Sequence, residues 1–81
     1  MTKEELKDQL TPIFRQTFSE PELTLNDEMN SNDVDRWDSL THMQLISRIE
    51  EMFCIKFKLK ELNRLKRVGD LMEVVLTKIN G

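Results

Sequence analysis

Residues 34–53 read Val-Asp-Arg-Trp-Asp-Ser-Leu-Thr-His-Met-Gln-Leu-Ile-Ser-Arg-Ile-Glu-Glu-Met-Phe. The front of this stretch is acidic and irregular, whereas its apolar side chains from Leu40 onward recur every three or four positions. That spacing is typical of an amphipathic helix, and no proline or glycine interrupts it. The predicted inward stripe consists of Leu40, Met43, Ile46, Ile49 and Phe53, widened by Leu45 and Met52.

The tripeptide Asp38-Ser39-Leu40 lies at the joint between the irregular and the periodic part. The first N–H groups of a helix have no partner within the helix, and the helix dipole favours negative charge there. A phosphate ester on Ser39 would therefore be stabilised locally. Taken without further context, Ser39 is instead a helix-capping serine, and Asp38 is a capping or first-turn acid.

The sequence around Ser39 resembles the phosphopantetheine attachment site of acyl carrier proteins. The agreement includes residues 37–42 (Trp-Asp-Ser-Leu-Thr-His), 49–53 (Ile-Glu-Glu-Met-Phe), 55–57 (Ile-Lys-Phe) and 67–71 (Arg-Val-Gly-Asp-Leu), so it spans nearly the whole chain. The pattern is similar to that of small stand-alone carriers that serve specialised biosynthetic pathways rather than housekeeping fatty acid synthesis.

This resemblance implies that Ser39 holds a 4'-phosphopantetheine arm taken from coenzyme A, on which acyl intermediates are carried as thioesters. Asp38 and Leu40 complete the motif, and the resemblance implies that Asp38 helps the modifying transferase to hold its magnesium. The implied partners are a phosphopantetheinyl transferase and acyl-loading and acyl-processing enzymes. The residues expected to take part in partner recognition are Asp35, Trp37, Thr41, His42, Gln44 and Arg48.

One departure from the family pattern concerns the expected partners. Thr41 and Gln44 stand where carriers of fatty acid synthesis tend to have acids, so we expect enzymes of that pathway to use this chain poorly. A basic run also follows the second helix, and we interpret it mainly as a solvated face. It consists of Lys56, Lys58, Lys60, Arg64, Lys66 and Arg67.

Two other classes of function remain open from the sequence. An aminoacyl or peptidyl carrier would use the same serine and the same arm. A helical interaction module would never be modified at Ser39. Hydrolase chemistry by Asp38, Ser39 and His42 is disfavoured, because no pattern places an acid behind the imidazole and no Gly-x-Ser-x-Gly elbow is present. We expect His42 to be a surface residue near the arm.

Length and charge set further limits. A chain of 81 residues predicts a single domain over residues 1–81. Such a domain buries roughly 60% of its unfolded surface, which is too little for a deep active site, so we do not expect an enzyme. Residues 1–53 carry 5 Lys/Arg against 12 Asp/Glu, a net charge of −7, and residues 54–81 carry 7 against 3, a net charge of +4. This distribution disfavours nucleic acid as a partner.

Cysteine content and hydropathy indicate the cellular compartment in which the protein is expected. The one cysteine, Cys54, has no partner in the chain for a disulfide, and no apolar run approaches the length of a signal segment or a membrane span. We therefore expect a reducing cytoplasm, no membrane insertion and a monomer. Cys54 itself is expected to end the second helix in a left-handed conformation.

The chain outside residues 34–53 completes an all-α prediction. Thr2-Lys3-Glu4-Glu5 is typical of a capping box and predicts a first helix, which Ser19-Glu20-Pro21 ends. Pro12 predicts a kink near residues 8–11, or two short helices. The inward residues of this helix are Leu6, Leu10, Ile13, Phe14 and Phe18, and those expected to hold the long following loop against the bundle are Leu23, Leu25 and Val34.

After the second helix we expect an extended connection that buries Ile55 and Phe57, then a short helix over residues 59–65. Val68-Gly69-Asp70 introduces the last helix, with Leu71, Val74, Val75 and Ile79 inward. The predicted fold is a small four-helix bundle with three longer helices and one short one. A carried chain that entered the bundle would meet Met43, Ile46, Met52, Phe57 and Val75.

Overall fold

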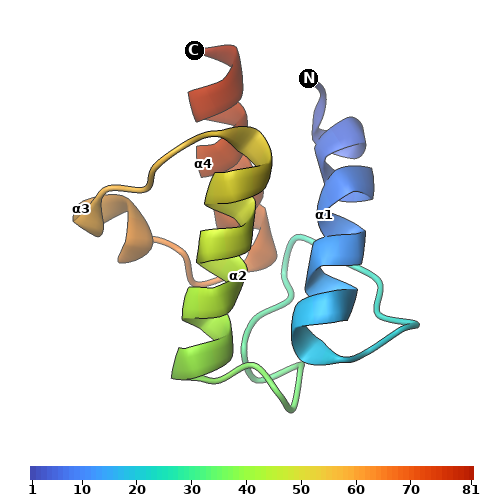
Figure 1. The fold of residues 1–81 in the computed structure, drawn as a ribbon. Helices are drawn as coiled ribbons and strands as arrows, with labels where there is room; N and C mark the ends of the chain where they lie inside the picture. Colours follow the sequence, from blue (N-terminus) through green and yellow to red (C-terminus); the bar gives the residue numbers. More distant parts are fainter.

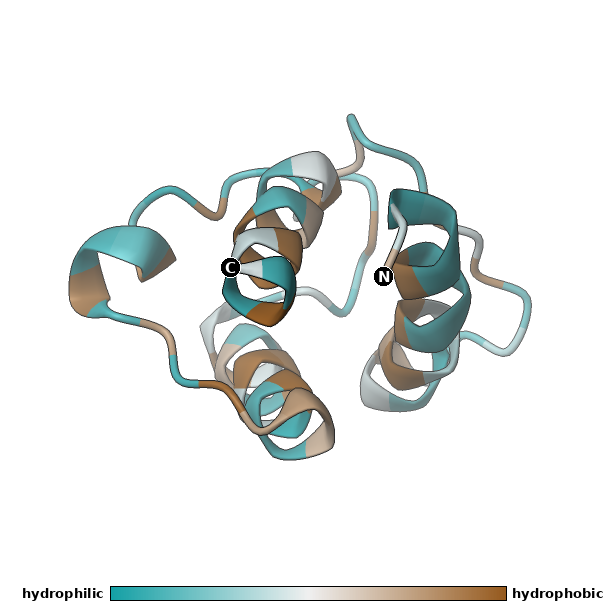
Figure 2. Ribbon diagram, turned by 90° about the horizontal axis from the view of Figure 1, so that it is seen from above, coloured by the Kyte–Doolittle hydropathy of each residue, from teal (hydrophilic) through white to brown (hydrophobic).

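The computed structural model describes residues 1–81 and contains four helices and no strand. They are α1 (Lys3–Phe18), α2 (Ser39–Phe53), α3 (Leu59–Leu62) and α4 (Val68–Asn80) (Figure 1). The three longer helices enclose the core, and α3 lies out to one side (Figure 2). The predicted all-α bundle with one short member is confirmed. None of the helices is both long enough and apolar enough to span a membrane.

Helix α1 begins with the predicted capping box. The Glu5 N–H donates to Thr2 Oγ1 at 3.2 Å, and the Thr2 N–H donates to Glu5 Oε1 at 2.9 Å. The helix then continues without interruption through Pro12, so the predicted division into two short helices is wrong. Pro12 lies on the exposed face, where the carbonyl of Asp8 that loses its partner can bond to water instead.

Two helices end at residues in the left-handed conformation that are not glycine. Ser19 closes α1 with φ 55°, and Cys54 closes α2 with φ 56°. In each case the N–H of the cap donates back to a carbonyl of the last turn, which satisfies a group that the helix leaves free. The predicted role of Cys54 at the end of the second helix is confirmed.

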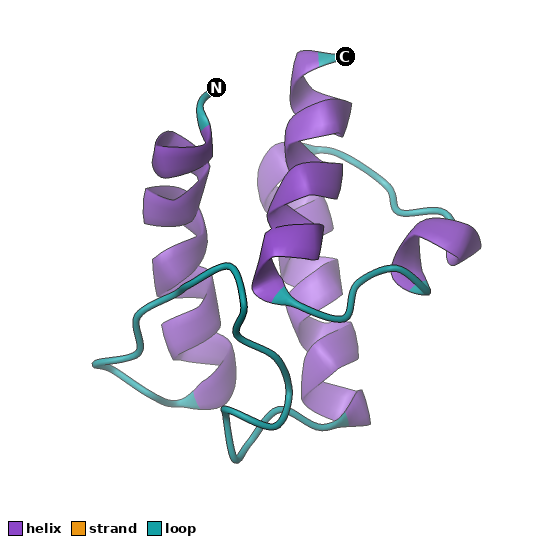
Figure 3. Ribbon diagram, turned by 180° about the vertical axis from the view of Figure 1, so that it is seen from behind, coloured by secondary structure: helices purple, strands orange, loops and turns teal.

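The loop of residues 19–38 crosses the back of the bundle and is held at its middle by α4 (Figure 3). The Val68 N–H donates to the Met29 carbonyl at 2.8 Å, and the Gly69 N–H donates to the Asp27 carbonyl at 2.9 Å. A Cβ at Gly69 would lie 2.9 Å from the Asp27 oxygen, so this close approach requires glycine. The buried loop residues are Leu25, Met29, Val34 and Trp37, while Leu23 is partly buried.

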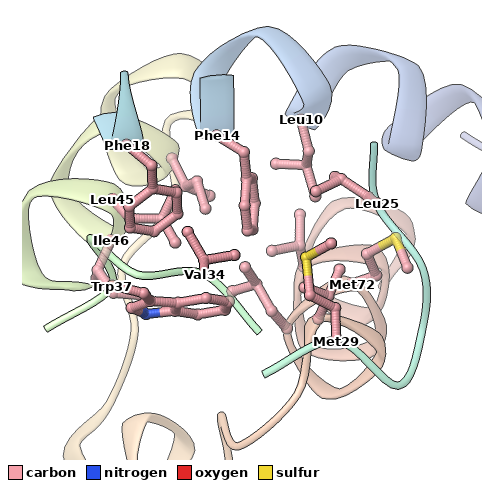
Figure 4. Close-up of a cluster of buried hydrophobic side chains, with 14 of the residues drawn as sticks. Leu10, Phe14, Phe18, Leu25, Met29, Val34, Trp37, Leu45, Ile46 and Met72 are labelled. Atoms are coloured by element: carbon pink, nitrogen blue, oxygen red, sulfur yellow. The ribbon is translucent and has the colours of Figure 1, made fainter. Parts of the chain in front are cut away.

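Fifteen buried hydrophobic side chains form one core, to which α1 contributes a continuous row of Leu6, Leu10, Phe14 and Phe18. Phe14 and Phe18 turn toward the indole of Trp37 (Figure 4), with ring centroids 5.9 and 5.2 Å away. Edge-on and tilted aromatic contacts of this kind add to the free energy of burial. The last residue of the loop before Asp38 is therefore an integral part of the core.

The inward face of α2 is narrower than the predicted stripe, of which Leu40, Met43 and Met52 are exposed. Leu45, Ile46 and Ile49 are buried. Leu40 is 70% exposed, and Met43 and Met52 are each 52% exposed. The apolar residues of α2 cover more than one side of the helix. The periodicity of the sequence is therefore compatible with more than one buried face. Packing against α1 and the rest of the core determines which face is buried.

The predicted interior path for a carried chain is therefore wrong in part. Ile46 and Val75 are buried and Phe57 is partly buried, but Met43 and Met52 are on the surface. Met72 of α4, by contrast, is fully buried.

The short helix α3 ends at Leu62, three residues earlier than predicted, and Leu62 packs against the core. The Phe57 N–H donates to Glu50 Oε2 at 2.9 Å, which fixes the extended connection to α2. Glu61 of α3 pairs with Lys78 of α4 at 2.8 Å, and this hydrogen bond lowers the pKa of the Glu61 carboxyl. Ile55 and Phe57 are partly buried rather than fully enclosed.

Candidate attachment site at the start of the second helix

The first turn of α2 is set by Asp38, which is the N-cap residue. Its Oδ1 accepts from the Thr41 N–H at 2.9 Å, and the Asp38 N–H in turn donates to Thr41 Oγ1 at 2.8 Å. Thr41 Oγ1 also donates to the carbonyl of Arg36 at 2.6 Å. Thr41 therefore takes the part that glutamate has in an ordinary capping box, and it ties the helix to the preceding loop.

Because Asp38 caps the helix, Ser39 does not. Ser39 is the first residue of α2, it is exposed, and its hydroxyl makes no hydrogen bond with another group of the protein. The alternative in which Ser39 is simply the capping serine is therefore wrong. The site presents a free hydroxyl directly beside the amides at the positive end of the helix dipole.

The carboxylate of Asp38 is held in its ionised form. The hydrogen bond from the Thr41 N–H lowers the pKa of Asp38, since it favours the charged carboxylate over the neutral acid. The side chain of Asp38 thus stays negative next to Ser39 throughout the neutral range.

His42 lies one turn after Ser39 and is half-buried, so the surface position predicted for it is only partly open to solvent. The indole N–H of Trp37 donates to His42 Nδ1 at 3.0 Å, and the planes of the two rings are 19° apart, with centroids 6.1 Å from each other. Burial lowers the pKa of His42. Trp37, which was expected to face a partner, is only 9% exposed, so little of its ring remains for such a contact.

An open hollow of about 580 Å³ lies beside Ser39. Three segments meet there: the end of the long loop, the start of α2 and the connection between α3 and α4. The lining residues are Ser31, Trp37, Asp38, Ser39, His42, Met43, Leu65 and Lys66. Sequence reasoning did not place Ser31, Leu65 or Lys66 at the site, because no local pattern links residues so far apart in the chain.

The motif residue Leu40 and the remaining predicted recognition residues divide into two groups. Leu40 and Gln44 are exposed on the first two turns of α2, and Asp35 is exposed on the loop just before it. Arg48 is also exposed, but it lines a separate hollow against α1, together with Ile13, Gln16, Glu51 and Met52. The structure therefore does not place Arg48 in the hollow beside Ser39.

Comparison with solved structures identifies the family. The solution NMR structure of a holo acyl carrier protein from Geobacter metallireducens shares 51% sequence identity with this chain. The match covers 90% of this chain and 84% of that one, with a TM-score of 0.86. This chain belongs to the acyl carrier proteins. No protein-family model and no curated protein matches it.

Acyl carrier proteins are not enzymes; they hold acyl groups while other enzymes act on them. The cofactor of the holo form is a covalent 4'-phosphopantetheine arm. The family also explains the shape of the site, since a carrier needs an accessible point of attachment and has no need of an enclosed pocket.

Proposed function

We propose that Ser39 carries the 4'-phosphopantetheine arm and that this acyl carrier protein serves a specialised pathway rather than housekeeping fatty acid synthesis. The observation that supports the attachment point is the free, exposed hydroxyl of Ser39 at the first position of α2, next to the capping carboxylate of Asp38. A phosphodiester at this position would gain from the free amides of the helix start.

When bound, the arm supplies a terminal thiol that holds the acyl group as a thioester. The protein contributes a rigid base for it. The two reciprocal hydrogen bonds between Asp38 and Thr41 fix the first turn, and the burial of Trp37 fixes the loop that leads into it. A substrate tethered to such a base reaches each partner enzyme at high effective concentration.

Intact mass spectrometry tests the attachment directly. Incubated with coenzyme A, magnesium and a phosphopantetheinyl transferase, the protein is expected to gain the mass of one phosphopantetheine. No gain of mass with a transferase that modifies a control carrier in the same tube would favour an unmodified interaction module. The mass of the protein purified from its own cells would then separate an acyl from an aminoacyl or peptidyl cargo.

Two surface features support a specialised set of partners. Gln44 and Thr41 bring no negative charge to the exposed start of α2, although fatty acid carriers tend to have acids there. The basic run from Lys56 to Arg67 is exposed, and of its six cations only Arg67 has an ion-pair partner, Asp70 at 3.5 Å. We infer that the enzymes of this pathway differ in surface charge from those of fatty acid synthesis.

With a fatty acid ketosynthase, this carrier is expected to react severalfold more slowly than an ordinary fatty acid carrier, and Gln44→Glu should recover part of the rate. One exposed ion pair contributes up to about 1 kcal/mol, so the gain should not exceed about fivefold. Thr41 is left unchanged because its hydroxyl holds the helix start.

The matched control is Gln9→Glu, which adds the same charge at an exposed position of α1. Equal rates for this carrier and the fatty acid carrier, or the same gain from Gln9→Glu, would contradict the proposal.

The single cysteine supports the further proposal of a reducing, cytoplasmic setting.

A further inference from the structure

The contact between Trp37 and His42 determines which nitrogen of the imidazole carries the proton. His42 Nδ1 accepts the indole N–H at 3.0 Å, so this nitrogen has no hydrogen of its own. A neutral imidazole has one N–H, which must then be on Nε2. The doubly protonated ring would place an N–H against the indole N–H, so the contact requires neutral His42.

His42 also shares the hollow beside Ser39. The two residues are three apart on α2, so their Cβ atoms lie about 5–6 Å from each other on one face of the helix. Nε2 is the ring nitrogen that Trp37 does not occupy. His42 thus has one free donor, and it belongs to a side chain that lines the hollow at the attachment point.

We propose that His42 is a positioning residue for the arm, whose Nε2–H donates a hydrogen bond to the phosphodiester at Ser39 while Trp37 occupies Nδ1. This inference rests on the proposed attachment at Ser39. The proposal also assigns a role to Trp37. Its hydrogen bond fixes the tautomer of His42, so that Nε2 presents a hydrogen-bond donor, and not an acceptor, to the phosphodiester.

The charged surroundings of His42 are simple. Asp38, on the same helix start, and Lys66, from the connection before α4, are the charged side chains that line the hollow. On the side of the core, Trp37 separates the imidazole from α1, whose Phe14 and Phe18 carry no charge. Burial is the cause that lowers the pKa of His42 in the unmodified protein.

A phosphodiester within hydrogen-bonding reach of His42 would favour the protonated imidazolium. Attachment of the arm should therefore raise the pKa of His42 relative to the unmodified protein.

Without the arm, the pKa of His42 in the folded protein lies below the ordinary value of about 6.5. The unfolded chain then binds a proton at His42 first as the pH falls, so the contribution of His42 lowers stability from about pH 6.5 down to its folded pKa.

The chain offers clean probes for this inference, since it contains one histidine and one tryptophan. In protein labelled with ¹⁵N on histidine, the neutral ring should appear as the Nε2–H tautomer. In the holo protein, the ³¹P resonance of the phosphodiester should shift between pH 5 and 8 with the same midpoint as His42, and this midpoint should be higher than in the apo protein. The N-terminal amine donates a hydrogen bond to Asn80 Oδ1 at 3.0 Å, at the other end of the bundle from the start of α2 (Figure 1).

Two variants separate positioning from a merely structural role. His42→Gln places an amide N–H near Nε2 without a titrating group, so its ³¹P resonance should stay close to the neutral wild-type value at every pH. His42→Ala should move that resonance and remove its pH dependence. Intact mass of each sample first establishes that the arm is attached, so a failure of attachment is distinguished from a failure of this inference.

A ³¹P resonance that ignores the titration of His42, or that is the same in His42→Ala as in the wild type, would overturn the proposal. An Nδ1–H tautomer in the neutral apo protein would overturn it as well.

Discussion

Ser39→Ala should abolish attachment of the phosphopantetheine arm and leave the stability of the domain almost unchanged. The side chain is exposed, and its hydroxyl makes no hydrogen bond within the protein, so its removal leaves no buried group unsatisfied. Intact mass after incubation with a transferase measures the first effect, and thermal unfolding measures the second. Attachment that persists in Ser39→Ala would show that another residue carries the arm.

Asp38→Ala is the matched comparison, one residue earlier. This change removes the acceptor of the Thr41 N–H and should lower the free energy of unfolding by about 0.5–2 kcal/mol, the usual cost of losing a helix cap. An Ser39→Ala variant destabilised as much as Asp38→Ala would show that the serine shares in capping after all.

Leu45→Ala should destabilise the domain by about 2–5 kcal/mol, whereas Met43→Ala should cost less than about 1 kcal/mol. Leu45 is fully buried in the core, and Met43, two residues earlier on the same helix, is 52% exposed. Truncation of Leu45 therefore leaves a cavity, but truncation of Met43 removes atoms that already contact water. For a domain of this size, each kcal/mol lowers Tm by roughly 4–8 °C.

Urea unfolding at neutral pH measures both changes in free energy. Met52→Ala provides a second exposed methionine on α2 and should behave like Met43→Ala. Equal losses for Leu45→Ala and Met43→Ala would mean that α2 presents to the core the stripe that periodicity predicted. Such a result would also restore Met43 as a residue that a buried acyl chain could contact.

Several features of this protein were determined by the sequence because they depend on neighbours in the chain. The capping box at Thr2 requires only residues within one turn, and it was predicted correctly. The start of α2 was located to within a residue, and so was the left-handed end at Cys54. The family was also predicted correctly from the sequence. Its motif is contiguous at Asp38-Ser39-Leu40, and similar residues follow along most of the chain.

The tertiary structure decided what depends on residues far apart in the chain. Which face of α2 is buried was set by its packing in the core, because its apolar side chains cover too much of the helix for periodicity to select one stripe. Pro12 was tolerated because it faces solvent. The hydrogen bond from Trp37 fixes the tautomer of His42, and it exists because α1 and α2 together bury the indole, a long-range event that no local pattern encodes.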